Sequence, residues 1–192
     1  MVPPNFDRYL EPFAGSACLF FALRPSEAVL GDLNSDLIET YAVVRDRPAA
    51  LWGALSKLPD TPSFYYELRD HFRSDASQLQ RVARFIYLNR FCFNAVYRTN
   101  RAGRFNVPRG RSTGSLPSER EFLACAEVLG SATLFSGDFA TLLADARPRD
   151  FVYLDPPYFR EGRRVYGEYG YGTFSDRDLP RLLDVLTGLD DR

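Results

Sequence analysis

The 192-residue sequence predicts an α/β fold, in which a Rossmann-like, doubly wound parallel sheet carries an inserted, mostly helical lobe. Three observations support this prediction. Short apolar segments alternate with helical patterns near both ends of the chain. A glycine or an aspartate follows each of those segments. Residues 48–118 break the alternation and are rich in helical patterns and arginine.

The first part of the chain has the order expected at the start of a doubly wound sheet. Its segments are a strand at 8–13, a turn leading into a helix at 14–23, a strand at 28–34 and a helix at 35–46. The last of these has apolar residues at helical spacing, and Asn34 or Ser35 is placed to cap it.

The middle of the chain is assigned to an insertion at 48–118, which leaves 1–47 and 119–192 as the core. Helices joined by polar turns are expected over 48–80, and a long helix over 81–97. Residues 98–115 lack periodicity, and NRAGRF predicts a hairpin with Gly103 at its tip.

After the insertion the alternation of helices and strands resumes. The expected elements are a helix at 118–130, strands at 132–139 and 150–158, and a helix at 174–191. Ser118 and Glu121 have capping-box spacing at the start of the first helix, and Gly130 ends it.

Charge is distributed unevenly along the chain, although the net charge is only −1. Eight arginines and no acidic residue lie between Arg81 and Arg111. Such a segment is typical of a surface that contacts phosphates, and a solvated arginine-rich face is the alternative. The charge pattern alone leaves both interpretations open.

Composition argues for a reduced, cytoplasmic protein. The three cysteines have no close pair spacing, and His71 is the only histidine, so we expect neither disulfides nor a metal site. No apolar run reaches the length of a membrane span, and the N-terminus lacks the pattern of a signal peptide.

The predicted strands end in groups suited to binding a ligand. In an open α/β sheet, ligands bind beyond the carboxyl ends of the strands. Taken one at a time, such groups are explained by turns, helix caps or a rigid loop. The groups are Phe13-Ala14-Gly15, Asp32, Asp138-Phe139 and Asp155-Pro156-Pro157-Tyr158.

Two of these groups indicate a nucleoside-containing cofactor. Gly15 allows a ligand to approach the backbone closely, and Asp32, at the end of the next strand, is placed to bind ribose hydroxyls. The sequence has no GxGxxG motif and no phosphate-binding lysine. A cofactor that has a nucleoside but no pyrophosphate, such as S-adenosylmethionine, meets these conditions.

The DPPY segment suits methyl transfer to an exocyclic amino group of a base. Such a nitrogen needs acceptors that hold its N–H bonds, and these are the Asp155 carboxylate and the Pro156 carbonyl. Pro156 and Pro157 fix the turn. Tyr158 offers a face on which an extruded base stacks. The rate then comes from orientation, without a covalent intermediate.

At this point the sequence resembles the Dam-type, D12 class of adenine-specific DNA methyltransferases. The matching segments are EPFAGSA (11–17), LGDLNSDLIETY (30–41), YLNRFCFNAVYRTNRAGRFNVPRG (87–110), GDF (137–139) and YLDPPY (153–158). Their order covers roughly residues 9–175, and the third segment is the most specific. The resemblance implies an S-adenosylmethionine-dependent methyltransferase sheet whose insertion recognises double-stranded DNA.

The resemblance also implies roles for individual residues. The cofactor pocket would comprise Phe13, Ala14, Gly15, Asp32, Asp138, Phe139 and Asp155. The catalytic segment would be Asp155, Pro156, Pro157 and Tyr158. The DNA-binding set would be Arg90, Phe93, Asn94, Arg98, Asn100, Arg101, Asn106 and Arg109, with Arg98 reading a base edge and Phe93 and Asn94 beside the vacated base position. Helix packing is the alternative for Phe93.

The chain also departs from the family pattern. Ala17 stands where the family has a second glycine, and the family's first and last segments are not recognised here. We therefore expect a chain truncated at both ends, whose sheet a complementary segment or partner chain completes. An inactive DNA-binding fragment and a methyltransferase acting on cytosine or RNA are the alternative functions. The recognition sequence (GATC is a guess), the biological role and the oligomeric state stay open.

Overall fold

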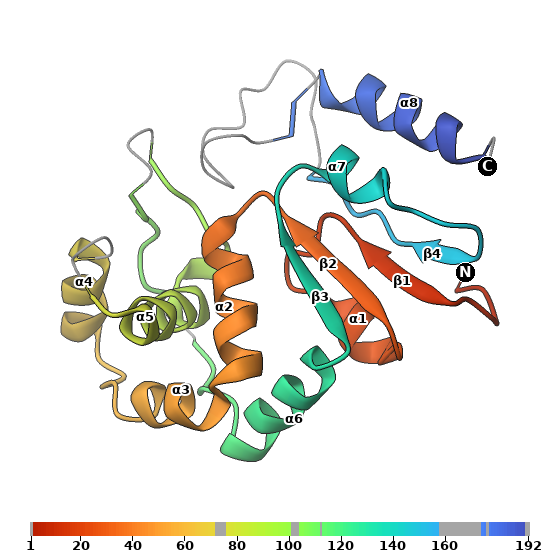
Figure 1. Cartoon of the computed structure of the whole chain (residues 1–192). Helices are drawn as coiled ribbons and strands as arrows, with labels where there is room; N and C mark the ends of the chain where they lie inside the picture. The colour runs from red at the N-terminus through yellow and green to blue at the C-terminus, as the bar shows by residue number, and fades with distance from the viewer. Residues whose placement is uncertain are drawn as a thin grey trace. The chain divides into compact units, whose positions relative to one another are not determined.

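The computed structural model contains a four-stranded parallel sheet with the strand order β3-β2-β1-β4 (Figure 1). The structure describes residues 2–71, 76–100, 104–111, 113–157, 174–175 and 177–190. The strands are β1 (Arg8–Glu11), β2 (Ala28–Asp32), β3 (Ala132–Ser136) and β4 (Asp150–Val152). The predicted α/β class with a parallel sheet is confirmed.

Helices cover both faces of this sheet, as a doubly wound fold requires. Side chains alternate between the faces of a strand, so Tyr9 and Leu10 point to opposite sides of β1. The ring of Tyr9 lies 6.3 Å, centroid to centroid, from Phe20 of α1 (Cys18–Leu23). Leu10 packs in a buried cluster with α7 (Phe139–Leu143) and with Leu182 of α8 (Asp178–Asp190).

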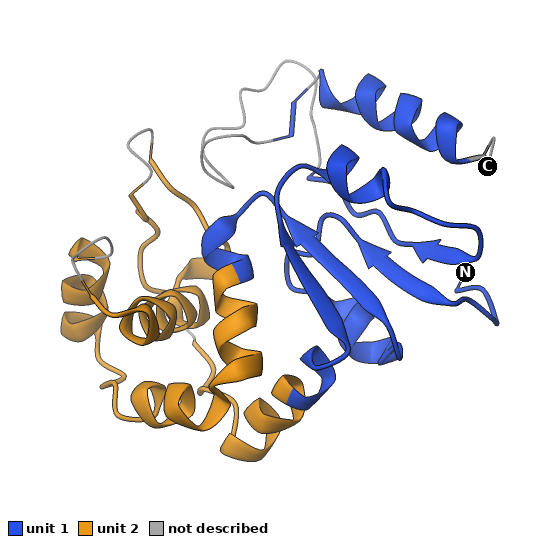
Figure 2. Ribbon diagram, in the orientation of Figure 1, with its two compact units in different colours: residues 1–38, 127–163, 174–192 blue, residues 39–126, 164–173 orange. Residues whose placement is uncertain are grey.

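The chain divides into two compact units, one of residues 1–38, 127–163 and 174–192, the other of 39–126 and 164–173 (Figure 2). The first unit holds the sheet with α1, α7 and α8. The second holds α3 (Pro48–Leu55), α4 (Pro62–Asp70), α5 (Gln78–Phe91) and the 3-10 turn η1 (Phe93–Ala95). Two helices run from one unit into the other, α2 (Ser35–Asp46) and α6 (Glu119–Leu129). The functional boundaries expected at residues 48 and 118 stay a prediction.

Side-chain caps fix where several helices begin. The Asn34 side chain accepts the backbone N–H groups of Asp36 and Leu37, so Asn34 caps α2. The predicted capping box before α6 is confirmed, since the Ser118 N–H donates to the Glu121 carboxylate at 2.8 Å and the Glu121 N–H donates to the Ser118 hydroxyl.

The expected helix over 81–97 has different ends in the structure. It begins earlier, at a Ser77–Gln80 capping box that the sequence analysis missed, and it ends at Phe91. Asn94 and Ala95 have left-handed backbone angles, with φ of 56° and 52°, which stop an α-helix. The chain there pairs instead with a later segment, as the Cys92–Arg109 bridge shows.

The second half of the sheet has shorter strands than expected. The strand predicted over 132–139 ends at Ser136, because Asp138 caps α7 by accepting the Ala140 N–H at 2.9 Å. The strand predicted over 150–158 ends at Val152. The last helix begins at Asp178 and not at Phe174.

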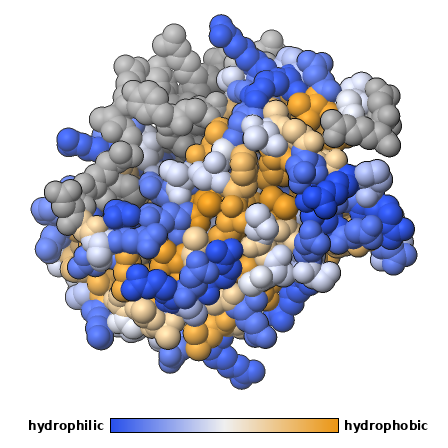
Figure 3. All heavy atoms as spheres, in the orientation of Figure 1, coloured by the Kyte–Doolittle hydropathy of each residue, from blue (hydrophilic) through white to orange (hydrophobic). Residues whose placement is uncertain are grey.

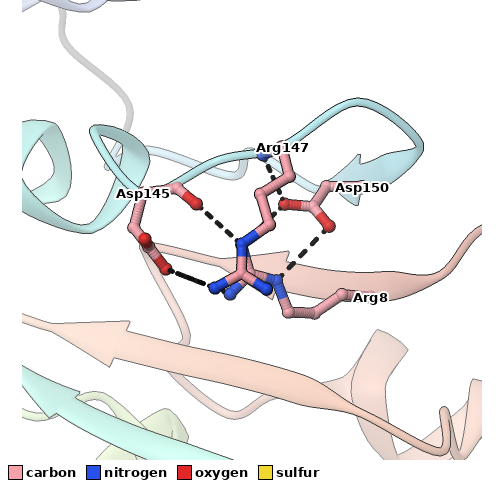
Figure 4. Close-up of polar contacts among 4 residues, drawn as sticks. All are labelled: Arg8, Asp145, Arg147 and Asp150. Carbon is pink, nitrogen blue, oxygen red and sulfur yellow. Dashed lines mark hydrogen bonds and ion pairs between the residues drawn. The ribbon is translucent and has the colours of Figure 1, made fainter.

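A buried ion cluster joins the first residues of β1 and β4 (Figure 4). The Arg8 guanidinium donates to Asp150 at 2.8 Å and to Asp145 at 3.1 Å. The side chains of Arg8 and Asp150 are only 7% and 3% exposed. These groups raise the pKa of Arg8, chiefly through its hydrogen bond to Asp150, so the cation stays charged.

The surface mixes polar and apolar side chains on the face drawn in Figure 3. In the described part of the chain, large exposed apolar side chains include Phe93 at 53% and, on α8, Leu179 at 48% and Leu183 at 56%. No helix among the described residues is long and apolar enough to cross a membrane. A segment or partner that completes the sheet stays a prediction.

Arg8→Ala should lower the free energy of unfolding by about 3–5 kcal/mol, because it leaves Asp150 buried without its cation. Denaturant unfolding of the purified chain measures this change. Arg147→Ala is the matched control, since Arg147 meets the same cluster at 3.6 Å from Asp145 with its side chain 63% exposed. Its loss should cost less than about 1 kcal/mol. Equal effects of the two variants would contradict the structural importance of the buried pair.

Candidate functional site

The carboxyl ends of the four parallel strands bring the predicted cofactor residues together in the first unit. The Ala14 N–H donates to the Gly31 carbonyl at 2.8 Å, which joins the loop after β1 to β2. The Gly137 N–H donates to the Asp32 carbonyl at 3.0 Å, which joins the loop after β3 to the end of β2. The turn after β1 therefore lies beside Asp32, and Asp32 lies beside the start of α7.

Asp32 is held as a fixed acceptor at the centre of this edge. Its carboxylate accepts the N–H of Gly15 at 3.1 Å and of Asn34 at 2.8 Å. Burial raises the pKa of Asp32 and the two backbone donors oppose that shift. Gly15 has φ of +48°, a conformation that glycine adopts without strain. The exposed Gly15 leaves its backbone accessible to a ligand.

Aromatic rings gather next to these polar groups. Phe13 lies 5.3 Å from Phe139, centroid to centroid, and 5.7 Å from Phe174. Phe139 is buried, so it belongs to the core as well as to this edge. Phe174 was not predicted from the sequence, because no motif marks it after the predicted catalytic segment.

Asp138 has contacts that the sequence did not predict. Its carboxylate caps α7 and forms an ion pair with Arg181 of α8, whose guanidinium also lies 4.7 Å from the centroid of the Phe139 ring. Arg181 lies 43 residues away in the chain, and no sequence pattern connects the two. A ligand that uses the Asp138 carboxylate has to share it with Arg181.

The predicted catalytic segment, which begins at Asp155, follows β4, which ends at Val152. The Tyr153 N–H donates to the Leu10 carbonyl at 2.9 Å, which continues the pairing of β4 with β1 up to the segment. Asp155 is exposed, and Pro156 and Pro157 are partly buried. Tyr158 lies outside the described residues.

Glu11 is a buried acid in the EPFAGSA segment to which the sequence pattern assigned no role. It ends β1, is 2% exposed, and accepts a hydrogen bond of 2.8 Å from the Tyr9 hydroxyl. Burial raises the pKa of Glu11 to about 7, the Tyr9 bond opposes this, and the negative charge of Asp155 raises it further. The signal that marks it is an acid between the apolar residue Leu10 and Pro12 at the end of the strand.

Four of the predicted DNA-binding residues line one cavity in the second unit. Its volume is about 300 Å³, and its lining comprises Phe93, Asn94, Val96, Arg98, Thr99, Asn106, Val107 and Pro108. Phe93 is 53% exposed, whereas Phe91 is buried and its ring centroid lies 4.6 Å from that of the tilted Tyr87 ring. Packing thus explains Phe91 and does not explain Phe93.

The other predicted DNA-binding residues do not line this cavity. Arg90 donates to the Ser115 carbonyl at 2.8 Å. Arg109 is paired with Asp60. The Asn100 side chain accepts the Arg104 N–H at 3.0 Å, and the pairing of Thr99 with Phe105 confirms the flanks of the predicted hairpin. Arg101 and the tip at Gly103 lie outside the described residues.

The described residues contain no group of three or more histidine, cysteine, aspartate or glutamate side chains placed to hold a metal ion. The polar groups at the strand ends offer carboxylate and backbone acceptors, a close backbone approach at Gly15 and aromatic surface at Phe13. This set of groups fits a nucleoside with ribose hydroxyls.

Stability should depend on pH through Glu11. The unfolded chain loses this proton near pH 4.5, whereas the folded chain holds it up to about pH 7. The contribution of Glu11 to the free energy of unfolding is therefore complete below pH 4.5. It is lost as the pH rises through about 7, and the loss is on the order of 3 kcal/mol. Denaturant unfolding of Glu11→Gln across this window should show a flatter dependence. Glu27→Gln, at an exposed position, should keep the wild-type slope; equal slopes in all three proteins would contradict this role.

Comparisons with known proteins agree with the resemblance read from the sequence. The model of the D12 class N6 adenine-specific DNA methyltransferases matches residues 1–192. The type II methyltransferase M1.LlaDCHI of Lactococcus lactis subsp. cremoris is 34% identical over 202 aligned residues, which span 100% of this chain and 71% of that protein. The type II methyltransferase M.MjaIII of Methanocaldococcus jannaschii is 34% identical, and the alignment covers 98% of this chain and 71% of that protein. The DNA adenine methylase of Escherichia coli K12 is 31% identical, with 98% and 70% covered. The chain therefore belongs to the D12 class N6 adenine-specific DNA methyltransferase family.

Proposed function

We propose that this chain methylates the exocyclic amino nitrogen of adenine in duplex DNA and uses S-adenosylmethionine as the methyl donor. The match to the adenine-specific family over residues 1–192 carries the proposal. Membership of the family supports DNA adenine methylation as the reaction. The identity of the methyl donor is what we propose in addition. The polar and aromatic groups at the strand ends support this choice of donor.

The donor site that we propose lies at the carboxyl edge of the sheet. The Asp32 carboxylate, already oriented by Gly15 and Asn34, would accept hydrogen bonds from ribose hydroxyls. Phe13 would pack against the nucleoside. When bound, the donor supplies a methyl group activated by a positively charged sulfur. No residue of the chain has to form a covalent bond in this scheme.

Asp155 and Pro156 are proposed to hold the target amino group. The carboxylate of Asp155 and the carbonyl of Pro156 would accept its two N–H bonds, so that the nitrogen lone pair faces the methyl group. The nitrogen loses one proton as it gains the methyl group, and in this proposal Asp155 would accept it. Pro156 and Pro157 restrict the turn, which limits the reorganisation needed when adenine arrives.

The cavity of the second unit is proposed to face the DNA. Arg98 would read a base edge, since arginine and guanine form the commonest specific contact in the major groove. Phe93, an exposed aromatic side chain at the cavity, would lie against the bases beside the extruded adenine. Asn94 and Asn106 would contact the DNA from the same cavity.

Methyl transfer from labelled S-adenosylmethionine to unmethylated duplex DNA tests the function. The product is digested to nucleosides, and label should appear in N6-methyladenine. Label in methylcytosine would change the substrate, and a chain that binds DNA without transferring label would overturn the proposed activity.

Asp155→Ala should lower methyl transfer by at least about a hundredfold, because the amino group loses its charged acceptor. DNA affinity should stay close to that of the wild type. Single-turnover transfer and a binding titration measure the two quantities. Asp184→Ala, at an exposed position on α8, is the matched control. Unchanged transfer by Asp155→Ala would remove Asp155 from the mechanism.

Arg98→Ala should relax sequence choice at one base pair by about 1–3 kcal/mol. The measurement is the rate of methylation across duplexes that differ at single positions. Arg104→Ala, on the hairpin but outside the cavity lining, should weaken binding equally for all sequences. The same uniform weakening in Arg98→Ala would make Arg98 a phosphate contact.

A further inference from the structure

Residues 104–111 form an extended segment that supplies part of the cavity wall. Burial alternates along it, with Phe105, Val107 and Gly110 buried and Asn106 and Pro108 exposed. Asn106, Val107 and Pro108 all line the cavity. The position of this wall therefore depends on what holds the backbone around Val107.

The two flanks of the 104–111 segment are held by backbone hydrogen bonds. Near one end, the Asn106 N–H donates to the Arg98 carbonyl at 3.3 Å. Near the other end, the Phe93 N–H donates to the Pro108 carbonyl at 2.8 Å, and the Gly110 N–H donates to the Phe91 carbonyl at 2.9 Å. A side chain at position 110 would place its Cβ 3.2 Å from the Cys92 carbonyl oxygen, so glycine permits this approach.

The centre of the segment is held by a side chain from a different helix. The Tyr65 hydroxyl, on α4, donates to the Val107 carbonyl at 3.0 Å. Tyr65 is fully buried, and Val107 is 5% exposed. Without this donor the Val107 carbonyl loses the side-chain hydrogen bond that fixes its position.

Tyr65 is itself rigidly placed. Its helix α4 begins at Pro62, and the Thr61 side chain caps it by accepting the Phe64 N–H at 3.3 Å. The ring of Tyr65 lies 6.4 Å from that of Tyr87, whose hydroxyl donates to the Pro59 carbonyl at 2.7 Å. Burial raises the pKa of Tyr65, so its hydroxyl remains a donor.

A second contact from the same region reaches the 104–111 segment. Asp60, which follows the residue bound by Tyr87, forms an ion pair with Arg109. The Asp60 side chain is 53% exposed, so solvent weakens this pair. Tyr65 is therefore the stronger of the two contacts, although it does not line the cavity.

We propose that Tyr65 is a positioning residue for sequence recognition, which fixes the cavity wall at 106–108 through the Val107 carbonyl without touching DNA. This inference rests on the proposed function, because it assigns the cavity to DNA. It adds a residue from α4 to the recognition machinery. Asp60 acts in the same way with a smaller effect.

The test compares Tyr65→Phe with the wild type on a pool of short duplexes whose central positions are randomised. Discrimination is the ratio of binding, and of methylation, between the preferred sequence and its single-position variants. Tyr65→Phe should lower this ratio about tenfold, equivalent to ~1.4 kcal/mol, while the maximal rate on the preferred sequence changes little. Tyr66→Phe is the matched control, since it removes a hydroxyl from the neighbouring, exposed residue of α4.

Two further variants separate positioning from general stability. Replacing Tyr65 by 4-aminophenylalanine restores an N–H donor and should restore discrimination. Asp60→Asn should lower discrimination less than Tyr65→Phe does. Thermal unfolding of each variant identifies any loss of fold.

The inference is overturned if Tyr65→Phe folds and discriminates like the wild type. It is also overturned if preferred and variant duplexes lose binding by the same factor, or if the amine fails to restore the ratio. A wild-type chain that binds duplexes selectively without methylating them would refute the proposed activity. The role of Tyr65 would then be tested by comparing the binding ratios of Tyr65→Phe and the wild type. A wild-type chain that shows no selectivity by either readout would overturn the inference.

Discussion

The attachment of β4 to β1 is the constraint on which the position of the predicted catalytic segment depends. β4 has three residues, and within the described part of the sheet it pairs with β1 alone. The buried Arg8–Asp150 pair joins the two strands at their first residues, and the Tyr153–Leu10 hydrogen bond joins them at the other end. Asp155 follows two residues later. A shift of β4 along β1 would move Asp155 relative to Glu11 at the end of β1, whose pKa its charge raises.

Buried tyrosine hydroxyls hold hydrogen-bond acceptors in place at the proposed cofactor edge and at the proposed DNA-binding cavity. The Tyr9 hydroxyl holds the Glu11 carboxylate at the end of β1, and the Tyr65 hydroxyl holds the Val107 carbonyl beside the cavity. In each case burial raises the pKa of the tyrosine, which keeps the hydroxyl protonated and the direction of donation fixed. At both places a buried tyrosine thus orients an acceptor that lies next to residues of the proposed site.

Sequence patterns predicted the features that depend on neighbours in the chain. The strand end at Asp32 and the Ser118–Glu121 box follow from local signals and are present in the structure, whereas the last strand ends at Val152, short of Asp155. The predicted helix end at residue 97 was wrong. Helix α5 ends at Phe91, because pairing of Cys92 with Arg109 competes with helix formation there. Contacts such as Tyr65 with Val107 and Asp138 with Arg181 join residues 42 and 43 positions apart, which no periodicity reveals.

The arginine-rich segment shows why charge alone is a poor guide to recognition. Arg81 pairs with Glu39, Arg90 donates to Ser115 and Arg109 pairs with Asp60, so these guanidinium groups stabilise the second unit. Any phosphate they contact must compete with these partners, which reduces the counterion release expected from a simple count of arginines. On the function proposed above, sequence choice would depend on the shape of the cavity around Arg98, and hence on the segment that Tyr65 contacts.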